Sequence, residues 1–227
     1  MLQIENVTKR YARHTAVDRL CLEVARGEIF GFLGPNGAGK TTTIKMIGGV
    51  LAPDAGAIRI AGIDLRRDPV AAKRRVGFVP DRPYLYEKLT GMEFLRFCAD
   101  LYGVAEKDFH ARARRELERF ALVDWADELI ESYSHGMKQR LIMCAALLHR
   151  PQLLVVDEPM VGLDPAAIRL VKGLFRQLAR EGTTVFLSTH TLAVAQDLCD
   201  RIGVLHRGRL VATGSLGDLQ RESGIAG

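Results

Sequence analysis

The strongest chemical signal in the sequence is a glycine-rich segment with the spacing G-x-x-x-x-G-K-[ST], which reads Gly34-Pro35-Asn36-Gly37-Ala38-Gly39-Lys40-Thr41-Thr42. It follows a strand-like apolar run and precedes a helical pattern, which is the context that a phosphate-binding loop requires. Glycines let successive backbone N–H groups point at phosphate oxygens, and the helix N-terminus adds positive potential. The segment therefore predicts a nucleotide site in which Lys40 reaches the β- and γ-phosphates and the Thr41 hydroxyl is a ligand of Mg²⁺.

A second signal is a pair of carboxylates, Asp157 and Glu158, at the end of the apolar run 153–156. A continuous apolar run of this length is typical of a strand that is buried on both faces. Beside a phosphate loop, Asp157 is placed to hold Mg²⁺ through its water shell. Glu158 is placed to polarise the attacking water as a general base. Alone, such a pair is commonly just the exit of a strand, but its combination with the phosphate loop favours catalysis.

Strand-like and helix-like stretches alternate along most of the chain, as expected for an α/β fold. The predicted strands are residues 2–7, 20–24, 29–33, 57–60, 76–79, 153–156 and 184–187, followed by a hairpin of 202–206 with 209–212. Between about residues 82 and 148 the pattern is helical only, with a capping-box spacing from Thr90 to Glu93. We therefore expect a single domain of residues 1–227, in which an α/β core (1–81 and 149–227) carries an all-helical insertion (82–148).

Composition sets further limits on the class of protein. Of the 227 residues, 48% are hydrophobic and 26% are charged, values that exclude collagen-like, coiled-coil and disordered chains. The longest apolar run, residues 141–148, is far shorter than the roughly 18 to 20 residues of a membrane-spanning helix. The N-terminus has no apolar segment of a secretory signal, so we expect a cytoplasmic chain with reduced cysteines. The net charge of +5 permits an anionic partner, although basic clusters such as residues 112–119 are commonly solvated helix faces.

Further motifs lie in a fixed order around these two. Residues 132–140 contain Ser134-His135-Gly136, Asp157 and Glu158 are followed by Gly162-Leu163-Asp164-Pro165, and a predicted strand ends in Leu187-Ser188-Thr189-His190. With these motifs the sequence resembles the nucleotide-binding subunit of ABC (ATP-binding cassette) transporters over essentially its whole length. In that comparison the three segments correspond to the signature motif, the D-loop and the switch histidine, and Tyr11 to the aromatic residue that stacks on adenine.

The resemblance implies a P-loop NTPase core with an antiparallel β part at the N-terminus and a helical subdomain that carries the signature. It implies a head-to-tail dimer with two ATP molecules and Mg²⁺ between the subunits. Each site would combine the P-loop of one chain with Ser134, His135 and Gly136 of the other, and Asp164 would lie at the same interface. Glu158, His190 and Lys40 would carry hydrolysis. It also implies transmembrane permease subunits on separate chains, docked on the helical insertion at the inner face of the cell membrane.

Two positions depart from the usual family pattern. The signature, commonly LSGGQ, reads Tyr133-Ser134-His135-Gly136-Met137, a variant similar to that of the ABC-2-type exporter branch, which suggests export rather than import. Asp81 stands where most of the family has Gln. An ionised Asp offers only acceptors, so it either joins Thr41 and Asp157 as a Mg²⁺ ligand or pairs with a cation such as Arg82. We favour the metal interpretation.

Several alternatives remain open from the sequence. Tyr11 can be an ordinary core or surface aromatic, Ser134 and Asp164 can be plain helix caps, and His190 can be a loop histidine. A soluble ABC ATPase that acts on nucleic acid or ribosomes is the alternative function, but the single cassette without a heptad run counts against it. A scaffold that binds nucleotide without turnover is disfavoured by the presence of both Glu158 and His190. We therefore expect no nucleic-acid partner.

Overall fold

The computed structural model describes residues 1–82 and 84–222, so residue 83 and residues 223–227 of the predicted domain lie outside the described part. A six-stranded sheet has the order β10-β9-β3-β8-β7-β6, in which all strands are parallel except β10. Its strands are β3 (Ile29–Leu33), β6 (Val76–Val79), β7 (Leu153–Asp157), β8 (Thr184–Thr189), β9 (Arg201–His206) and β10 (Arg209–Gly214). This is the α/β core that the sequence predicts.

A second, antiparallel sheet is formed by the N-terminal part of the chain, as the family resemblance implies. Its order is β2-β1-β4-β5, with β1 (Leu2–Tyr11), β2 (His14–Val24), β4 (Ala55–Ile60) and β5 (Ile63–Asp64). The first two strands are longer than the sequence predicts. The polar residues Lys9 and Arg10 interrupt the apolar pattern, yet they still pair with Val17 and Thr15 in the ladder. Tyr11 consequently lies at the tip of a two-residue hairpin.

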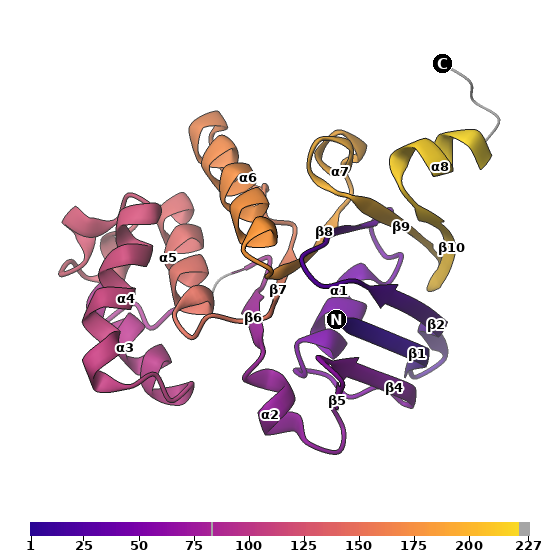
Figure 1. Cartoon of the computed structure of the whole chain (residues 1–227), viewed down its shortest axis with the longest axis horizontal. Helices are drawn as coiled ribbons and strands as arrows, with labels where there is room; N and C mark the ends of the chain where they lie inside the picture. Colours follow the sequence, from indigo (N-terminus) through magenta and orange to yellow (C-terminus); the bar gives the residue numbers. More distant parts are fainter. Residues whose placement is uncertain (83, 223–227) are drawn as a thin grey trace.

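The helices are α1 (Lys40–Ile47), α2 (Pro69–Lys73), α3 (Gly91–Leu101), α4 (Glu106–Arg119), α5 (His135–Leu147), α6 (Pro165–Arg180), α7 (Leu192–Leu198) and α8 (Leu216–Glu222). Two short 3₁₀ turns, Val123–Trp125 and Ile130–Ser132, lead into α5. The expected capping box is present, because Thr90 and Glu93 each accept a hydrogen bond from the other's backbone N–H. Figure 1 shows α3, α4 and α5 gathered on one side of the central sheet, away from the N-terminal sheet.

Two hydrophobic cores sandwich the central strands. Along β7, Leu154 and Val156 face the core shared with α3–α6, whereas Leu153 and Val155 face the core shared with α1 and the N-terminal sheet. This alternation is what a strand buried on both faces requires. In the second core, the stacked rings of Phe30 and Phe186 have centroids 5.6 Å apart. The central sheet is thus packed on both faces.

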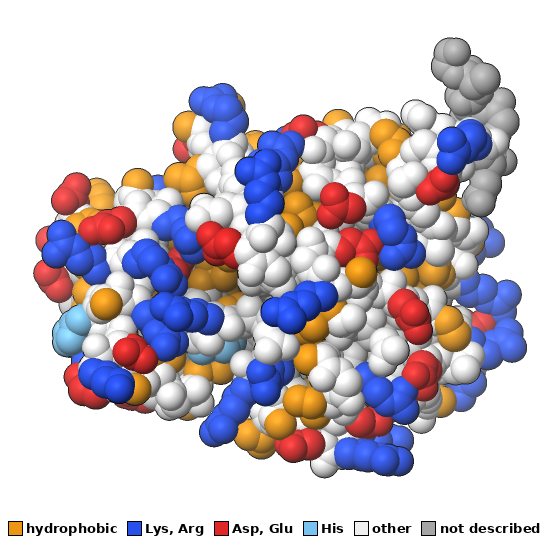
Figure 2. Space-filling model, viewed as in Figure 1, with side chains coloured by type: hydrophobic (Ala, Val, Ile, Leu, Met, Phe, Trp, Pro, Cys, Tyr) orange, Lys and Arg blue, Asp and Glu red, His pale blue; other side chains and the backbone are white. Residues whose placement is uncertain are grey.

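The surface of the described residues carries mixed charge. Figure 2 shows basic side chains interspersed with acidic ones on the face in view. The arginine-rich helix α4 largely neutralises its own charge, since Arg112 pairs with Asp108, Arg114 with Glu118, and Arg115 and Arg119 with Glu116. Across the ranges that the structure describes, none of the helices is both long and apolar enough to cross a membrane.

Candidate active site

A cavity of about 400 Å³ lies at the edge where the parallel strands end, next to the N-terminal hairpin. It brings together side chains from four separate parts of the sequence. Its lining includes Tyr11, His14, Asn36, Gly37, Gly39, Lys40, Thr41, Thr42, Asp81 and Glu158. Most of the residues that the sequence predicts for one nucleotide site therefore lie around one cavity. A cavity at this edge is the usual place for a ligand in an open α/β sheet.

The glycine-rich segment forms the turn between β3 and α1, as its spacing predicts. Gly39 has φ of +107°, and a Cβ atom there would lie 2.3 Å from the carbonyl oxygen of Ala16, so only glycine fits. Gly39 is also the N-cap of α1 and provides no side-chain cap. The first N–H groups of the helix are thus left free of side-chain partners at the cavity, as an anion site requires.

Lys40 is only 6% exposed and is held inside this turn. Its ammonium donates to the carbonyl oxygens of Gly34 (2.6 Å) and Pro35 (3.3 Å). It also lies 3.7 Å from Oε1 of Glu158. The segment's one lysine is thereby positioned between the phosphate-binding turn and the carboxylate at the end of β7.

Asp157 ends β7 and is 2% exposed. Burial raises the pKa of its carboxyl group, hydrogen bonds from the Ser188 and Thr41 hydroxyls act in the opposite direction, and the negative charges of Asp81 and Glu158 raise it further. The hydroxyl of Thr41 and the carboxylate of Asp157 therefore lie side by side. They are hard oxygen donors of the kind that Mg²⁺ prefers.

The residues present fit a magnesium site of a particular type. Within residues 1–82 and 84–222 there is no cluster of three or more His, Cys, Asp or Glu side chains that could form a complete metal cage. Mg²⁺ is commonly bound by one or two protein oxygens, with water and substrate phosphates supplying the rest. The Thr41–Asp157 pair beside a phosphate-binding turn matches that arrangement. Asp81 lines the same cavity but is exposed, and its Oδ1 accepts a hydrogen bond from the backbone N–H of Arg82 at 2.8 Å.

Glu158 has an unusual backbone conformation, with φ of +50°. Residues other than glycine seldom adopt this left-handed region, and those that do concentrate at functional sites. Its N–H donates to Oγ of Ser188 (3.1 Å), and its Oε2 lies 3.0 Å from Nδ1 of His190. Glu158 is therefore held both through its backbone N–H and through its side-chain carboxylate. A carboxylate fixed in this way, facing the cavity, is suited to accept a proton from water.

The remaining predicted residues lie outside the lining of this cavity. Ser134 is the N-cap of α5 and accepts a hydrogen bond from the N–H of Met137 at 3.3 Å, with His135 and Gly136 in the first turn. Asp164 is the N-cap of α6. Its carboxylate accepts hydrogen bonds from the backbone N–H groups of Ala167 and Ala166, and these bonds lower its pKa. Both caps agree with the simpler interpretation of these residues. Within one chain, the signature segment is thus not part of the cavity around Lys40.

Two residues at or beside this site, His14 and Ser188, are not among the site residues that the sequence predicts. His14 lines the cavity because it is the cross-strand partner of Tyr11, and the intervening Ala12-Arg13 has none of the glycine-containing pairs that mark a two-residue hairpin in a sequence. Ser188 bonds to both Asp157 and Glu158 because β7 and β8 pair with Asp157 opposite Ser188. Nothing in the local sequence around Ser188 indicates this pairing.

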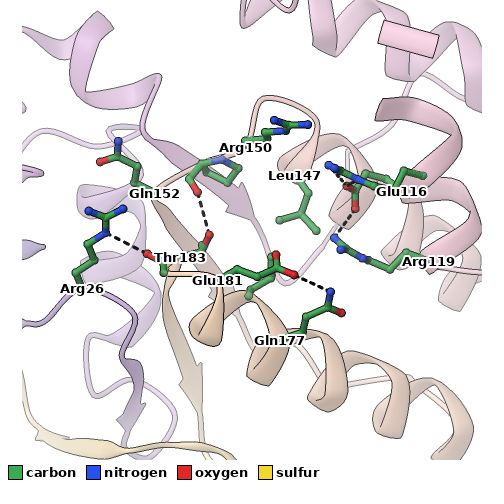
Figure 3. A pocket seen from close by; sticks show the side chains of 13 residues that line it. Arg26, Glu116, Arg119, Leu147, Arg150, Gln152, Gln177, Glu181 and Thr183 are labelled. Carbon is green, nitrogen blue, oxygen red and sulfur yellow. Dashed lines mark hydrogen bonds and ion pairs between the residues drawn. The ribbon is translucent and has the colours of Figure 1, made fainter. Parts of the chain in front are cut away.

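A second, larger cavity of about 620 Å³ lies between α4, the α5–β7 turn and the end of α6 (Figure 3). It contains none of the predicted site residues. Arg115 and Arg119 bind the fully buried Glu116, and Glu181 accepts a hydrogen bond from Gln177. Helices α4, α5 and α6 all end at this cavity, and helix C-termini carry partial negative charge. The arginines therefore balance charges of the fold itself, which distinguishes this cavity from the first.

Together, the phosphate-binding turn, the buried aspartate and the fixed glutamate define a P-loop nucleotide hydrolase. The chain belongs to the ABC transporter family, whose model matches residues 17–161. It is 41% identical over 219 residues to the linearmycin resistance ATP-binding protein LnrL of Bacillus subtilis (strain 168), covering 96% of this chain and 70% of that protein. It is also 41% identical over 214 residues to the Nod factor export ATP-binding protein I of Paraburkholderia xenovorans (strain LB400), covering 94% and 70%.

A solved structure extends this similarity to the fold. The dimeric post-hydrolysis state of the ATP-binding cassette MJ0796, bound to ADP and Pi, superposes with a TM-score of 0.88 at 26% identity, covering 95% of this chain and 99% of that one. The predicted family and fold are therefore confirmed. The chain is an ATP-binding subunit of the ABC transporter type and hydrolyses ATP.

Proposed function

We propose that this chain powers an exporter, and that Glu158 is the general base of its Mg²⁺-dependent ATP hydrolysis. The observation that carries the catalytic part is the fixed position of Glu158, which lies 3.7 Å from Lys40 and 3.0 Å from His190 at the cavity. His190 orients the carboxylate through Nδ1. Lys40 leaves the carbonyl oxygens of its own loop to bind the β- and γ-phosphates. Export is supported by the similarity to the Nod factor export protein.

In this proposal Thr41 and Asp157 hold the metal ion, with Asp81 as the additional candidate. Bound Mg²⁺ would neutralise charge on the phosphates. Burial and the neighbouring charges of Asp81 and Glu158 raise the pKa of Asp157, and a divalent cation beside it would favour the ionised carboxylate. The N–H groups of the phosphate-binding turn, from Gly34 to Thr42, bind the phosphates themselves, and Tyr11 stacks on the adenine ring.

The signature residues act on a second copy or a related cassette. Ser134, His135 and Gly136 lie at the exposed N-terminus of α5, outside the lining of the chain's own cavity. A helix N-terminus is a suitable partner for the γ-phosphate that another subunit holds. Asp164 would then lie at the same interface. The dimeric form of the related MJ0796 cassette supports this arrangement.

A membrane-embedded partner is supported by an exposed apolar surface beside Asp81. Tyr84 and Tyr86, which are 86% and 60% exposed, lie in the segment that leads to α3. The ring of Tyr86 packs edge-on against Phe97, and Leu101 is exposed one turn further along the helix. Apolar clusters of this kind mark protein interfaces. We assign this surface to a transmembrane permease on a separate chain, which would hold the protein at the inner face of the membrane.

The alternative, a soluble ATPase that acts on nucleic acid, has less support. The most basic helix, α4, pairs its arginines with its own carboxylates, which leaves little free charge for phosphate backbones.

Replacement of Glu158 by Gln tests the catalytic proposal. The amide keeps the shape of the side chain but is a poor base. We expect ATP binding to persist, turnover to fall by about 10² to 10⁴-fold, and a dimer to accumulate in ATP, as measured by light scattering. Glu181→Gln, which lines the other cavity, is the matched control and should turn over normally. A Glu158→Gln protein that hydrolyses ATP at the normal rate and stays monomeric in saturating ATP would contradict the proposal.

A further inference from the structure

Ser188 occupies a position between the two carboxylates of the site. It lies in β8 directly opposite Asp157 of β7, and it is completely buried. Its hydroxyl donates to Oδ1 of Asp157 at 2.5 Å. The same oxygen accepts a hydrogen bond from the backbone N–H of Glu158 at 3.1 Å. One hydroxyl therefore joins the side chain of one acidic residue to the backbone of the next.

The two bonds have different consequences. A serine hydroxyl has a single proton, so its donation to Asp157 fixes which carboxylate oxygen is turned toward β8 and which remains for other partners. Its acceptance from Glu158 stabilises a backbone conformation, φ of +50°, that residues with a Cβ atom seldom adopt. The bond thereby helps to keep the Glu158 side chain near Lys40, whose Nζ lies 3.7 Å from Oε1.

His190 cannot replace this function, because it contacts the other end of Glu158. The histidine Nδ1 binds Oε2 of the side chain, whereas the Ser188 hydroxyl binds the backbone N–H. His190 is about half exposed, while Ser188 is buried in the sheet. His190 follows the end of β8, whereas Ser188 lies within the strand, paired with Asp157.

We propose that Ser188 is a positioning residue, which fixes the metal-holding carboxylate of Asp157 and the general base Glu158 relative to each other. The inference rests on the proposed function, in which these two carboxylates act on the same ATP. Through this link the carboxylate that would hold the metal ion and the carboxylate that would accept the proton keep a fixed relative position.

The chain contains a matched control for this link in the same strand. Thr184, at the other end of β8, is also completely buried. Its hydroxyl likewise makes two bonds, donating to the carbonyl oxygen of Ala25 and accepting from the N–H of Gly27, both at 3.0 Å. Neither of these bonds involves Asp157 or Glu158. Loss of either hydroxyl removes two hydrogen bonds from one strand, but only those of Ser188 reach Asp157 and Glu158.

The experiment compares Ser188→Ala, Ser188→Thr and Thr184→Ala in thermal unfolding, ATP affinity and steady-state ATPase. We expect Ser188→Ala to lower kcat about 10- to 100-fold, as outer-shell partners of metal sites do, with ATP affinity changed less than about twofold. Ser188→Thr keeps the hydroxyl and should restore most of kcat. Thr184→Ala should lower the melting temperature comparably and leave kcat unchanged.

Several outcomes would overturn the inference. They are a normal kcat in Ser188→Ala, an equal loss of kcat in Thr184→Ala, or a Ser188→Thr protein that unfolds normally but is as slow as Ser188→Ala. If Ser188→Ala does not fold, Ser188→Cys, which keeps only a weak donor, takes its place with the same expectation. Glu158→Gln distinguishes the general-base role of Glu158 from the positioning role of Ser188. If it abolishes turnover while Ser188→Ala remains fully active, the base assignment stands and only the positioning role fails.

Discussion

The imidazole ring of His135 packs on the backbone of Gly162. A Cβ atom built on Gly162 would lie 3.0 Å from Cδ2 and 3.1 Å from Nε2 of the ring. The contact joins the first turn of α5 to the loop that follows Glu158, within one chain. The family resemblance places His135 against the nucleotide of a partner subunit. In this chain its side chain also has an internal contact, which a glycine at this position of the signature cannot make.

The first prediction concerns this contact. Gly162 has φ of +76°, so Gly162→Ala strains the backbone by about 1 kcal/mol and also displaces the ring. In a His135→Ala background only the backbone strain remains. We expect a coupling free energy of about 0.5 to 1 kcal/mol between the two changes, measured by denaturant unfolding of the wild type, both single variants and the double variant. If the two changes in the free energy of unfolding are additive, the His135 ring moves aside without cost and the contact does not contribute to stability.

The second prediction concerns Lys40. Its ammonium is the buried positive charge of the phosphate-binding turn, and hydrogen bonds to charged groups contribute about 1.5 to 3 kcal/mol each. Lys40→Ala should therefore weaken ATP binding by roughly 10- to 100-fold, measured by titration with a fluorescent ATP analogue. Lys45→Ala, on an exposed position of the same helix, is the control and should bind normally. Unchanged affinity in Lys40→Ala would refute the assignment of the phosphate site.

The third prediction concerns Asp81, which lines the cavity while its Oδ1 accepts the N–H of Arg82. If its carboxylate is a Mg²⁺ ligand, Asp81→Asn should raise the Mg²⁺ concentration for half-maximal ATPase several-fold, and Asp157→Asn should be far more damaging. The measurement is a Mg²⁺ titration of ATPase activity. An unchanged Mg²⁺ requirement, with loss only of stimulation by the membrane partner, would make Asp81 a coupling residue instead.

The fourth prediction concerns His149 and the pH dependence of stability. Burial lowers the pKa of His149 to about 4, with the positive charge of Arg112 acting in the same direction and the hydrogen bond to Val76 opposing it. Nε2 lies 3.1 Å from the carbonyl oxygen of Val76 and must carry a proton, whereas Nδ1 is buried with no partner in the described part of the chain. The ring also stacks on Tyr102, with centroids 3.8 Å apart. The native protein thus holds His149 neutral.

The direction in which stability changes with pH follows from proton uptake by His149 in the unfolded chain. In the unfolded chain His149 takes up a proton below its ordinary pKa of 6.5, but in the folded protein only near pH 4. The free energy of unfolding should therefore fall as the pH drops from about 6.5 to about 4, by at most about 3 kcal/mol from this group. His149→Gln should flatten this part of the curve in denaturant titrations, whereas His206→Gln, at an exposed position, should not. Equal slopes in all three proteins would contradict the prediction.

The parts of the site that are local in the sequence could be predicted from it. The turn from Gly34 to Thr42 specifies its own backbone through its glycines, and the run before Asp157 specifies a strand buried on both faces. Both are consequences of short-range chemistry. The same is true of the cap at Thr90, whose side chain accepts the N–H of Glu93 three residues later.

What could not be predicted depends on strand register and on pairings between distant segments. Ser188 acquires its place only because β8 lies beside β7, and His14 only because the hairpin at Tyr11 is two residues long. The sequence predicts too short a β1 because charged strand residues such as Lys9 and Arg10 carry no apolar signal. Likewise, the contact of His135 with Gly162 arises from the packing of α5 against a loop, which no spacing encodes.

The position of β3 in the central sheet has a consequence for the order in which the protein folds during synthesis. Ile29 pairs with Val185, and Phe30 with Arg201, so both neighbours of this strand lie more than about 150 residues later in the chain. At a synthesis rate of about 5 to 20 residues per second, β3 waits roughly 8 to 30 s for its first neighbour. During that time the phosphate-binding turn has no sheet to anchor it. The turn can be anchored in the sheet, and so bind nucleotide in its native form, only after β8 and β9 have been synthesised.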